Sequence, residues 1–124
     1  MLRILVVDDD KNMRQLLALH LENAGYQVDV AENPFAAGHA LIRARPDLII
    51  TDINMPGLDG FDFVAVLRQD NELRDIPVVF LSTEPPEQAR AAVLKVERFI
   101  SKPVRADTLL SIVASQVGGR VPIG

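Results

Sequence analysis

The chain has 124 residues, a length that fits one domain, and it has no cysteine, which excludes disulfides and thiolate metal sites. Its net charge is -4 at pH 7, so direct binding to the phosphate backbone of nucleic acid is disfavoured. No apolar stretch approaches the roughly 20 residues that span a bilayer, and the first residues lack the pattern of a secretory signal. We therefore expect a cytoplasmic domain that does not enter the membrane.

Short apolar runs, mostly rich in valine and isoleucine, recur along the chain. Their length and composition are typical of strands that are buried on both faces. In chain order they lie at residues 3–7, 27–31, 47–51, 77–81 and 98–100.

Each run is followed by a stretch with apolar residues at helical spacing. The second stretch has a clear start, because Asn33 can cap it and Pro34 suits the first helical position. The apolar side predicted for this helix consists of Phe35, Ala36, Ala40 and Leu41. The apolar side predicted for the fourth helix consists of Ala89, Ala92 and Val93. In chain order, the predicted helices begin near Met13, Pro34, Gly60, residues 84–86 and Asp107.

Strands that are each followed by a helix predict an α/β fold, with a parallel sheet and helices on both of its faces. The domain is expected to cover residues 1–117. Residues 118–124 contain three glycines and one proline, and they are expected to form a flexible tail or the start of a linker.

Polar residues follow four of the five predicted strands. They are Asp8, Asp9 and Asp10 after the first, Asp52 after the third, Ser82 and Thr83 after the fourth, and Lys102 after the fifth. Because the carboxyl ends of parallel strands share one edge of a sheet, these groups should converge there. Converging carboxylates repel one another unless a cation lies between them, and oxygen ligands together with a phosphate favour Mg²⁺ over Ca²⁺. A carboxylate beside Mg²⁺, a lysine and a hydroxyl is suited to accept a phosphoryl group.

Each of these residues alone has a simpler interpretation. The acids at 8–10 could cap a helix, Asp52 could belong to a turn, Ser82 could be a cap and Lys102 a surface charge. Their shared position at strand ends favours a common chemical role.

Four segments together resemble a known signature. They are VVDDD at 6–10, DINMPGLDG at 52–60, LS at 81–82 and KP at 102–103. In this order they are similar to the response-regulator receiver domains (CheY-like domains) of two-component signal transduction, over about residues 3–117. The resemblance implies a flavodoxin-like, doubly wound sheet of strand order 2-1-3-4-5. It also implies a signalling switch rather than an enzyme, with a histidine kinase or phosphotransfer protein as donor and an unidentified downstream protein as target.

The resemblance assigns roles to individual residues. It makes Asp52 the phosphoryl acceptor, with Ser82 and Lys102 as the groups that contact the phosphoryl oxygens, and it implies a cis bond between Lys102 and Pro103. The Mg²⁺ ligands that it implies are Asp8, Asp9, Asp52 and the backbone carbonyl of Asn54. Phe99 takes the place of the aromatic residue that turns inward when such a switch is phosphorylated.

The chain departs from the family pattern at several positions. Thr83 is larger than the alanine or glycine usual after the hydroxyl residue, so small phosphoryl donors should react slowly. In the family, the positions that Asn54 and Glu84 occupy affect how long the phosphoryl group stays on the acceptor. An amide together with an acid at these positions predicts a short-lived phosphoryl group. The segment between Ser82 and Lys102 is shorter than usual. In the family, output and dimerisation use the face of the fourth helix, fifth strand and fifth helix. The partner and any homodimer through this face can therefore be inferred from the family less directly than the chemistry can.

Two other functions remain open. A degenerate receiver would bind partners without being phosphorylated. A phosphohydrolase of the haloacid-dehalogenase type would use Asp8 and Asp10 as its active pair, although the Met55-Pro56-Gly57 turn has no role in that class.

Overall fold

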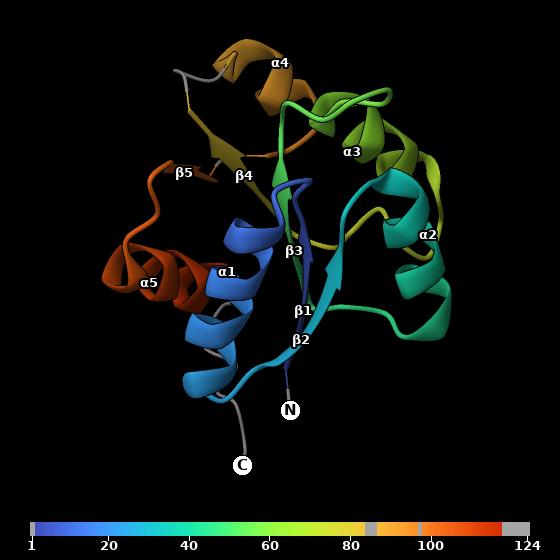
Figure 1. Ribbon diagram of the computed structural model, residues 1–124. Coiled ribbons are helices and arrows are strands. Elements are labelled where there is room, and N and C mark those ends of the chain that lie inside the picture. The colour runs from blue at the N-terminus through green and yellow to red at the C-terminus, as the bar shows by residue number, and fades with distance from the viewer. Residues whose placement is uncertain (1, 84–86, 97, 118–124) are drawn as a thin grey trace.

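The computed structural model describes residues 2–83, 87–96 and 98–117. Within these residues the chain forms five strands and five helices in strict alternation (Figure 1). The strands are β1 (Arg3–Val7), β2 (Gln27–Ala31), β3 (Leu48–Asp52), β4 (Val78–Ser82) and β5 (Arg98–Ser101). The helices are α1 (Lys11–Asn23), α2 (Pro34–Arg43), α3 (Gly60–Gln69), α4 (Gln88–Val93) and α5 (Ala106–Gln116). None of these helices combines the length and apolar composition needed to cross a membrane.

The strands form one parallel sheet in the order β2-β1-β3-β4-β5, which confirms the predicted fold and the implied strand order. Helices α1 and α5 cover one face of this sheet, and α2, α3 and α4 cover the other (Figure 1). The strand order reverses beside β1, where β2 lies on one side and β3 on the other. In sheets of this kind, that reversal marks the edge where ligands bind.

The core consists of two layers because side chains on a strand point alternately to the two faces. On β1, Ile4 and Val6 pack toward α1 and α5, whereas Leu5 and Val7 pack toward α2 and α3. All four are at most 1% exposed, and each such side chain contributes about 1.5–3 kcal/mol of burial free energy. The residues of β3 and β4 are all buried, which explains why these runs are mostly apolar up to the polar residues at their carboxyl ends.

Side-chain caps fix the starts of three helices. Asp10 accepts hydrogen bonds from the first turn of α1, Asn33 from that of α2 and Asp59 from that of α3. Such a cap contributes about 1 kcal/mol. Gly25 follows α1 with a φ of 99°, as expected for the residue that ends it.

The structure shifts some of the predicted boundaries. β3 and β4 each begin and end one residue later than predicted, so Asp52 and Ser82 are the last residues of their strands. Helix α4 begins at Gln88, while residues 84–86, where it was predicted to begin, lie outside the described residues. The tail at 118–124 also lies outside them, so its prediction stays a prediction.

The predicted apolar face of α2 was wrong at Phe35 alone, since Ala40 is buried and Ala36 and Leu41 pack against the core, and the face predicted for α4 was wrong at Ala92 and Val93. Phe35 is 86% exposed, because α2 packs on the sheet through the small residues Ala37 and Ala40 and turns Phe35 away from it. On α4, Ala91 is buried while Val93 is 82% exposed and Ala92 is also exposed; the side chain of Ala89 is outside the described part.

Candidate functional site

The predicted polar residues meet at the carboxyl edge of the sheet. Asp8 directly follows β1, Asp52 and Ser82 end β3 and β4, and Lys102 directly follows β5. Asp8 is 0% exposed, and Asp52 and Ser82 are each 6% exposed. Burial of these polar groups beside a largely apolar sheet is costly unless they are paired, so their partners determine what the edge can do.

Lys102 joins two of the strands through its ammonium group. Its Nζ lies 2.9 Å from Oδ2 of Asp8 and 3.1 Å from Oδ2 of Asp52. Its side chain is 15% exposed, so these ion pairs are largely shielded from water. The backbone amide of Lys102 donates to the carbonyl of Ser82 at 2.9 Å, and the bond to Pro103 is cis, as the family resemblance implied.

The charges at this edge shift the pKa of two groups. Burial raises the pKa of the Asp52 carboxyl group above its ordinary value, and the negative charge of Asp8 raises it further. The hydrogen bond and the positive charge of Lys102 act to lower this pKa, as does the backbone of Asn54, but burial outweighs them. Burial lowers the pKa of Lys102, but hydrogen bonds and charges from Asp8 and Asp52 outweigh it and leave that pKa raised. Lys102 therefore stays charged, and a further cation would favour the ionised form of Asp52.

Asp8, Asp9 and Asp52 form an acidic cluster in which one carboxylate oxygen of each lies within 4.8 Å of the others. Asp8 and Asp52 are buried and Asp9 is exposed, so the cluster opens to solvent on one side. Among the described residues, these carboxylates and Lys102 leave two net negative charges when ionised. Hard oxygen donors with an excess negative charge of two fit a divalent cation, and an exposed side leaves room for water and a phosphate oxygen, as Mg²⁺ prefers.

Asp10 is oriented away from this cluster. Its Oδ1 accepts hydrogen bonds from Asn12 and Met13 at 2.9 and 3.3 Å, while its amide donates to Oδ1 of Asp8 at 2.9 Å. Arg14 donates from Nη1 to the carbonyl of Asp8 at 2.8 Å. The sequence analysis did not identify Arg14; only its place in the first turn after the acids could have suggested it.

A close backbone approach fixes the loop that follows Asp52. The amide of Gly60 donates to the carbonyl of Ile53 at 2.7 Å, and a Cβ at position 60 would lie 2.8 Å from Cα of Ile53. Only glycine allows α3 to begin this close to the end of β3. The backbone of Asn54 also acts to lower the pKa of the Asp52 carboxyl group, so the same loop lies against that side chain.

The remaining predicted residues lie around this edge or behind it. Thr83 is exposed beside Ser82, and Glu84 is outside the described residues. Phe99 is half-buried on β5, with its ring stacked 6.2 Å from that of Phe80, which in turn lies 5.1 Å from Phe61 in an edge-on contact. A short aromatic column therefore crosses from β5 to α3.

Comparisons with known proteins point in one direction. The family model of the response regulator receiver domain matches residues 4–114. Protein PilH of Pseudomonas aeruginosa is 37% identical over 122 residues, which cover 96% of this chain and 100% of PilH. The chemotaxis response regulator CheY4 of Vibrio cholerae has a similar structure, with a TM-score of 0.87 at 31% identity over 94% of this chain and 98% of that chain.

Several relatives are longer. The phosphate regulon transcriptional regulatory protein PhoB of Pseudomonas aeruginosa is 35% identical over 102 residues, which are 81% of this chain and 44% of PhoB. The chain spans about half the length of several curated relatives that it matches.

Proposed function

Since the chain belongs to the response regulator receiver domains of two-component systems, we propose that it accepts a phosphoryl group on Asp52 and thereby changes its binding to partners. The observation that carries this proposal is the position of Lys102, whose Nζ lies within 3.1 Å of both Asp8 and Asp52. The Lys102 ammonium already contacts the carboxylate that would receive the phosphoryl group, so it is placed to contact the phosphoryl oxygens after transfer.

In the proposed step, an oxygen of the Asp52 carboxylate forms a bond to phosphorus while the bond from phosphorus to the donor breaks. The donor's leaving group keeps the electron pair, and from a phosphohistidine it is an imidazole nitrogen that is then protonated. Lys102 and the hydroxyl of Ser82 contact the phosphoryl oxygens, where negative charge develops. The residues that would hold Mg²⁺ are Asp8, Asp9, Asp52 and the backbone carbonyl of Asn54. When bound, this ion supplies positive charge that offsets the carboxylates and the phosphoryl oxygens.

The response to phosphorylation is proposed to follow β4 and β5. Ser82 moves toward the new oxygens, and Phe99 turns inward beside Phe80. Phe99 has no hydroxyl, so it can respond only by a change in burial. Asn54 and Glu84, two residues after Asp52 and Ser82, are proposed to make the phosphoryl group labile. Thr83 is proposed to restrict access of the donor.

The proposed donor is a histidine kinase or a phosphotransfer protein, and the output is contact with a downstream protein rather than with nucleic acid or a membrane. A homodimer through the face of α4, β5 and α5 belongs to this proposal, as does a location in the cytoplasm.

Intact mass measures the acceptor directly. The chain is incubated with Mg²⁺ and acetyl phosphate, beside Asp52→Asn, a sample with chelator and Asp107→Asn as a matched control at an exposed carboxylate outside the acidic cluster. The expected result is one added phosphoryl group in the chain and in Asp107→Asn, absent from the other two samples. An adduct that persists in Asp52→Asn would refute the assignment of the acceptor.

The two alternatives predict different results. If Thr83→Ala also gives no adduct and a beryllofluoride mimic causes no change, the chain is a receiver that binds partners unphosphorylated. Turnover of a simple phosphomonoester would support a phosphohydrolase, but that class needs Asp10 at the reacting edge, and Asp10 instead caps α1.

A further inference from the structure

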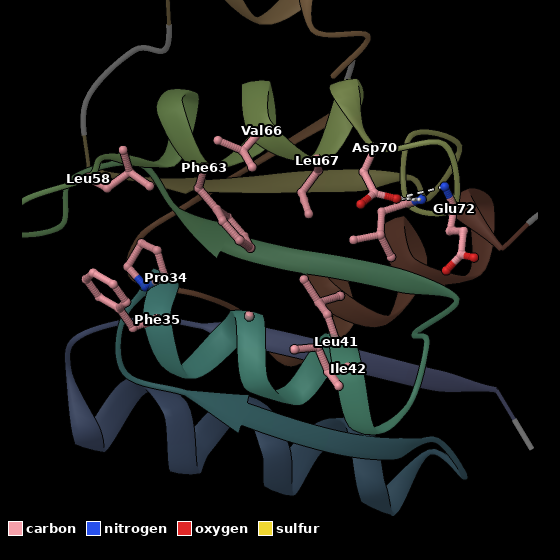
Figure 2. A pocket seen from close by; sticks show the side chains of 12 residues that line it. Pro34, Phe35, Leu41, Ile42, Leu58, Phe63, Val66, Leu67, Asp70 and Glu72 are labelled. Carbon is pink, nitrogen blue, oxygen red and sulfur yellow. Dashed lines mark hydrogen bonds between the residues drawn. The ribbon is translucent and has the colours of Figure 1, made fainter.

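An apolar groove of about 770 Å³ lies between α2 and α3, on the outer surface of the helical layer (Figure 2). Its walls include four large side chains that the fold leaves in contact with solvent. These are Phe35 at 86% exposed, Ile42 at 85%, Val66 at 61% and Leu58 at 40%. Apolar side chains gathered around one groove indicate a binding surface rather than the scattered exposure that is normal for a protein surface.

The lining residues follow helical spacing on both walls. Phe35 and Ile42 lie two turns apart on α2, so they project from the same side of that helix. On α3, Phe63 is followed by Val66 and Leu67 at intervals of three and four residues, which places these three on one side of that helix. Figure 2 shows side chains of both helices directed into the space between them. A third helix laid along this space would meet apolar side chains along its middle.

The charges are placed at the ends of the groove. Among the described residues that line it, the charged ones are Asp70 and Glu72, both at the end opposite Phe35 (Figure 2). At the Phe35 end, a second hollow shares part of this wall and adds the carboxylate of Glu32; Asp9 lines it too, but it is one of the residues proposed to hold Mg²⁺. Carboxylates therefore border the apolar strip at both ends, and at the Glu72 end Arg45 also lies close, with its Nε donating to the backbone carbonyl of Glu72 at 3.1 Å.

The negative charge at the two ends of the groove favours some binding partners over others. A second copy of the chain that packs through the same groove, in either direction, would bring acidic ends against acidic ends. A ligand with basic groups at its two ends and an apolar middle would instead pair with them. Each wall helix has ten residues, or about 15 Å of axis, which matches about three turns of a partner helix.

We infer that the groove between α2 and α3 binds an amphipathic helix of a partner protein, with apolar residues on one face and lysine or arginine in its first and last turns. This site is separate from the face of α4, β5 and α5, and its existence does not depend on phosphorylation of Asp52. Binding buries Phe35 and Ile42, which the fold leaves exposed, and this burial supplies the affinity; the acidic ends set the orientation and the preference for a basic helix.

The probe is a fluorescein-labelled peptide of about 14 residues, with leucines at helical spacing and lysines in both end turns. Fluorescence anisotropy measures its affinity for the unmodified chain and for Ile42→Glu. The matched control is Leu19→Glu, on α1 outside the groove, where the side chain is 54% exposed. Both substitutions add one negative charge at an exposed apolar position, so non-specific attraction of the basic peptide would strengthen in both.

Binding to the groove predicts that Ile42→Glu weakens the affinity about tenfold or more, while Leu19→Glu leaves it unchanged within about twofold. A peptide with glutamate in place of lysine should bind weakly, and amide shifts caused by the basic peptide should map to α2 and α3. The inference is overturned if the basic peptide does not bind, or if both variants lose affinity alike. It is also overturned if the acidic peptide binds equally well, or if sedimentation shows a dimer that Ile42→Glu abolishes.

Discussion

Arg68 on α3 donates from Nε to the backbone carbonyl of Leu94 at 2.7 Å, and so ties the end of α3 to the end of α4. The same guanidinium donates from Nη1 to the carbonyls of Arg74 and Ile76 at 3.0 and 2.7 Å, in the segment that leads into β4. Burial lowers the pKa of Arg68 and the charge of Asp75 opposes this, but the group remains charged at neutral pH. One side chain thus holds three segments that meet behind the candidate output face.

Replacing Arg68 with methionine should destabilise the chain by about 2 kcal/mol, because carbonyl groups that lose a charged donor are left without a partner. Arg68→Lys should recover only part of this, since an ammonium cannot reach all three carbonyls at once. Urea unfolding measures the change, and the exposed Arg43→Met serves as control, expected within about 0.5 kcal/mol of the unmodified chain. Equal effects of Arg68→Met and Arg43→Met would contradict this role.

The aromatic column of Phe61, Phe80 and Phe99 should show a graded response to truncation. Phe80 is 0% exposed and contacts both other rings, so Phe80→Ala should cost about 3–5 kcal/mol. Phe99→Ala should cost clearly less, because Phe99 is only half-buried and its removal leaves a space that water can enter. Denaturant unfolding of the two variants tests this order, and a larger loss for Phe99→Ala would refute it.

Much of the fold could be predicted because the strands of a parallel sheet are buried on both faces. The all-buried runs of β3 and β4 leave a sequence pattern that depends little on their neighbours. The convergence of Asp8, Asp52 and Lys102 could be predicted for a related reason, since parallel strands bring their carboxyl ends to one edge. Helix faces were less predictable: Phe35 is apolar at a suitable spacing, yet α2 packs through Ala37 and Ala40.

Contacts that join distant segments through the backbone had no signal in the sequence. In the sequence, Arg68 is indistinguishable from an ordinary surface arginine, and only the structure shows that it donates to the carbonyl of Leu94. Arg90 lies 4.3 Å from the ring centre of Phe61, a cation–π contact that depends on how α4 is placed against α3. Such pairs follow from tertiary packing rather than from local pattern.

The close approach at Gly60 should make that position intolerant of any side chain. Gly60→Ala would force the start of α3 away from Ile53, at a cost of about 1–3 kcal/mol, and would displace the loop that orients Asp52. Gly38→Ala is the matched control: it lies inside α2, where a Cβ would meet nothing within 4 Å, so alanine should stabilise the helix by about 1 kcal/mol. Urea unfolding of both variants should therefore give shifts of opposite sign, and shifts of the same sign would argue against the packing explanation.

The exposed Thr83 beside Ser82 should limit the rate at which small donors reach Asp52. Thr83→Ala removes a β-branched side chain from this edge and should raise the initial rate of labelling by acetyl phosphate, with Thr83→Ser in between because serine lacks only the methyl group. Intact mass followed over time gives the three rates. If access is the cause, the order Ala, Ser, Thr should hold for the rate of labelling while the final extent at saturating donor stays the same. Equal rates for all three would show that the side chain at position 83 does not lie in the path of the donor.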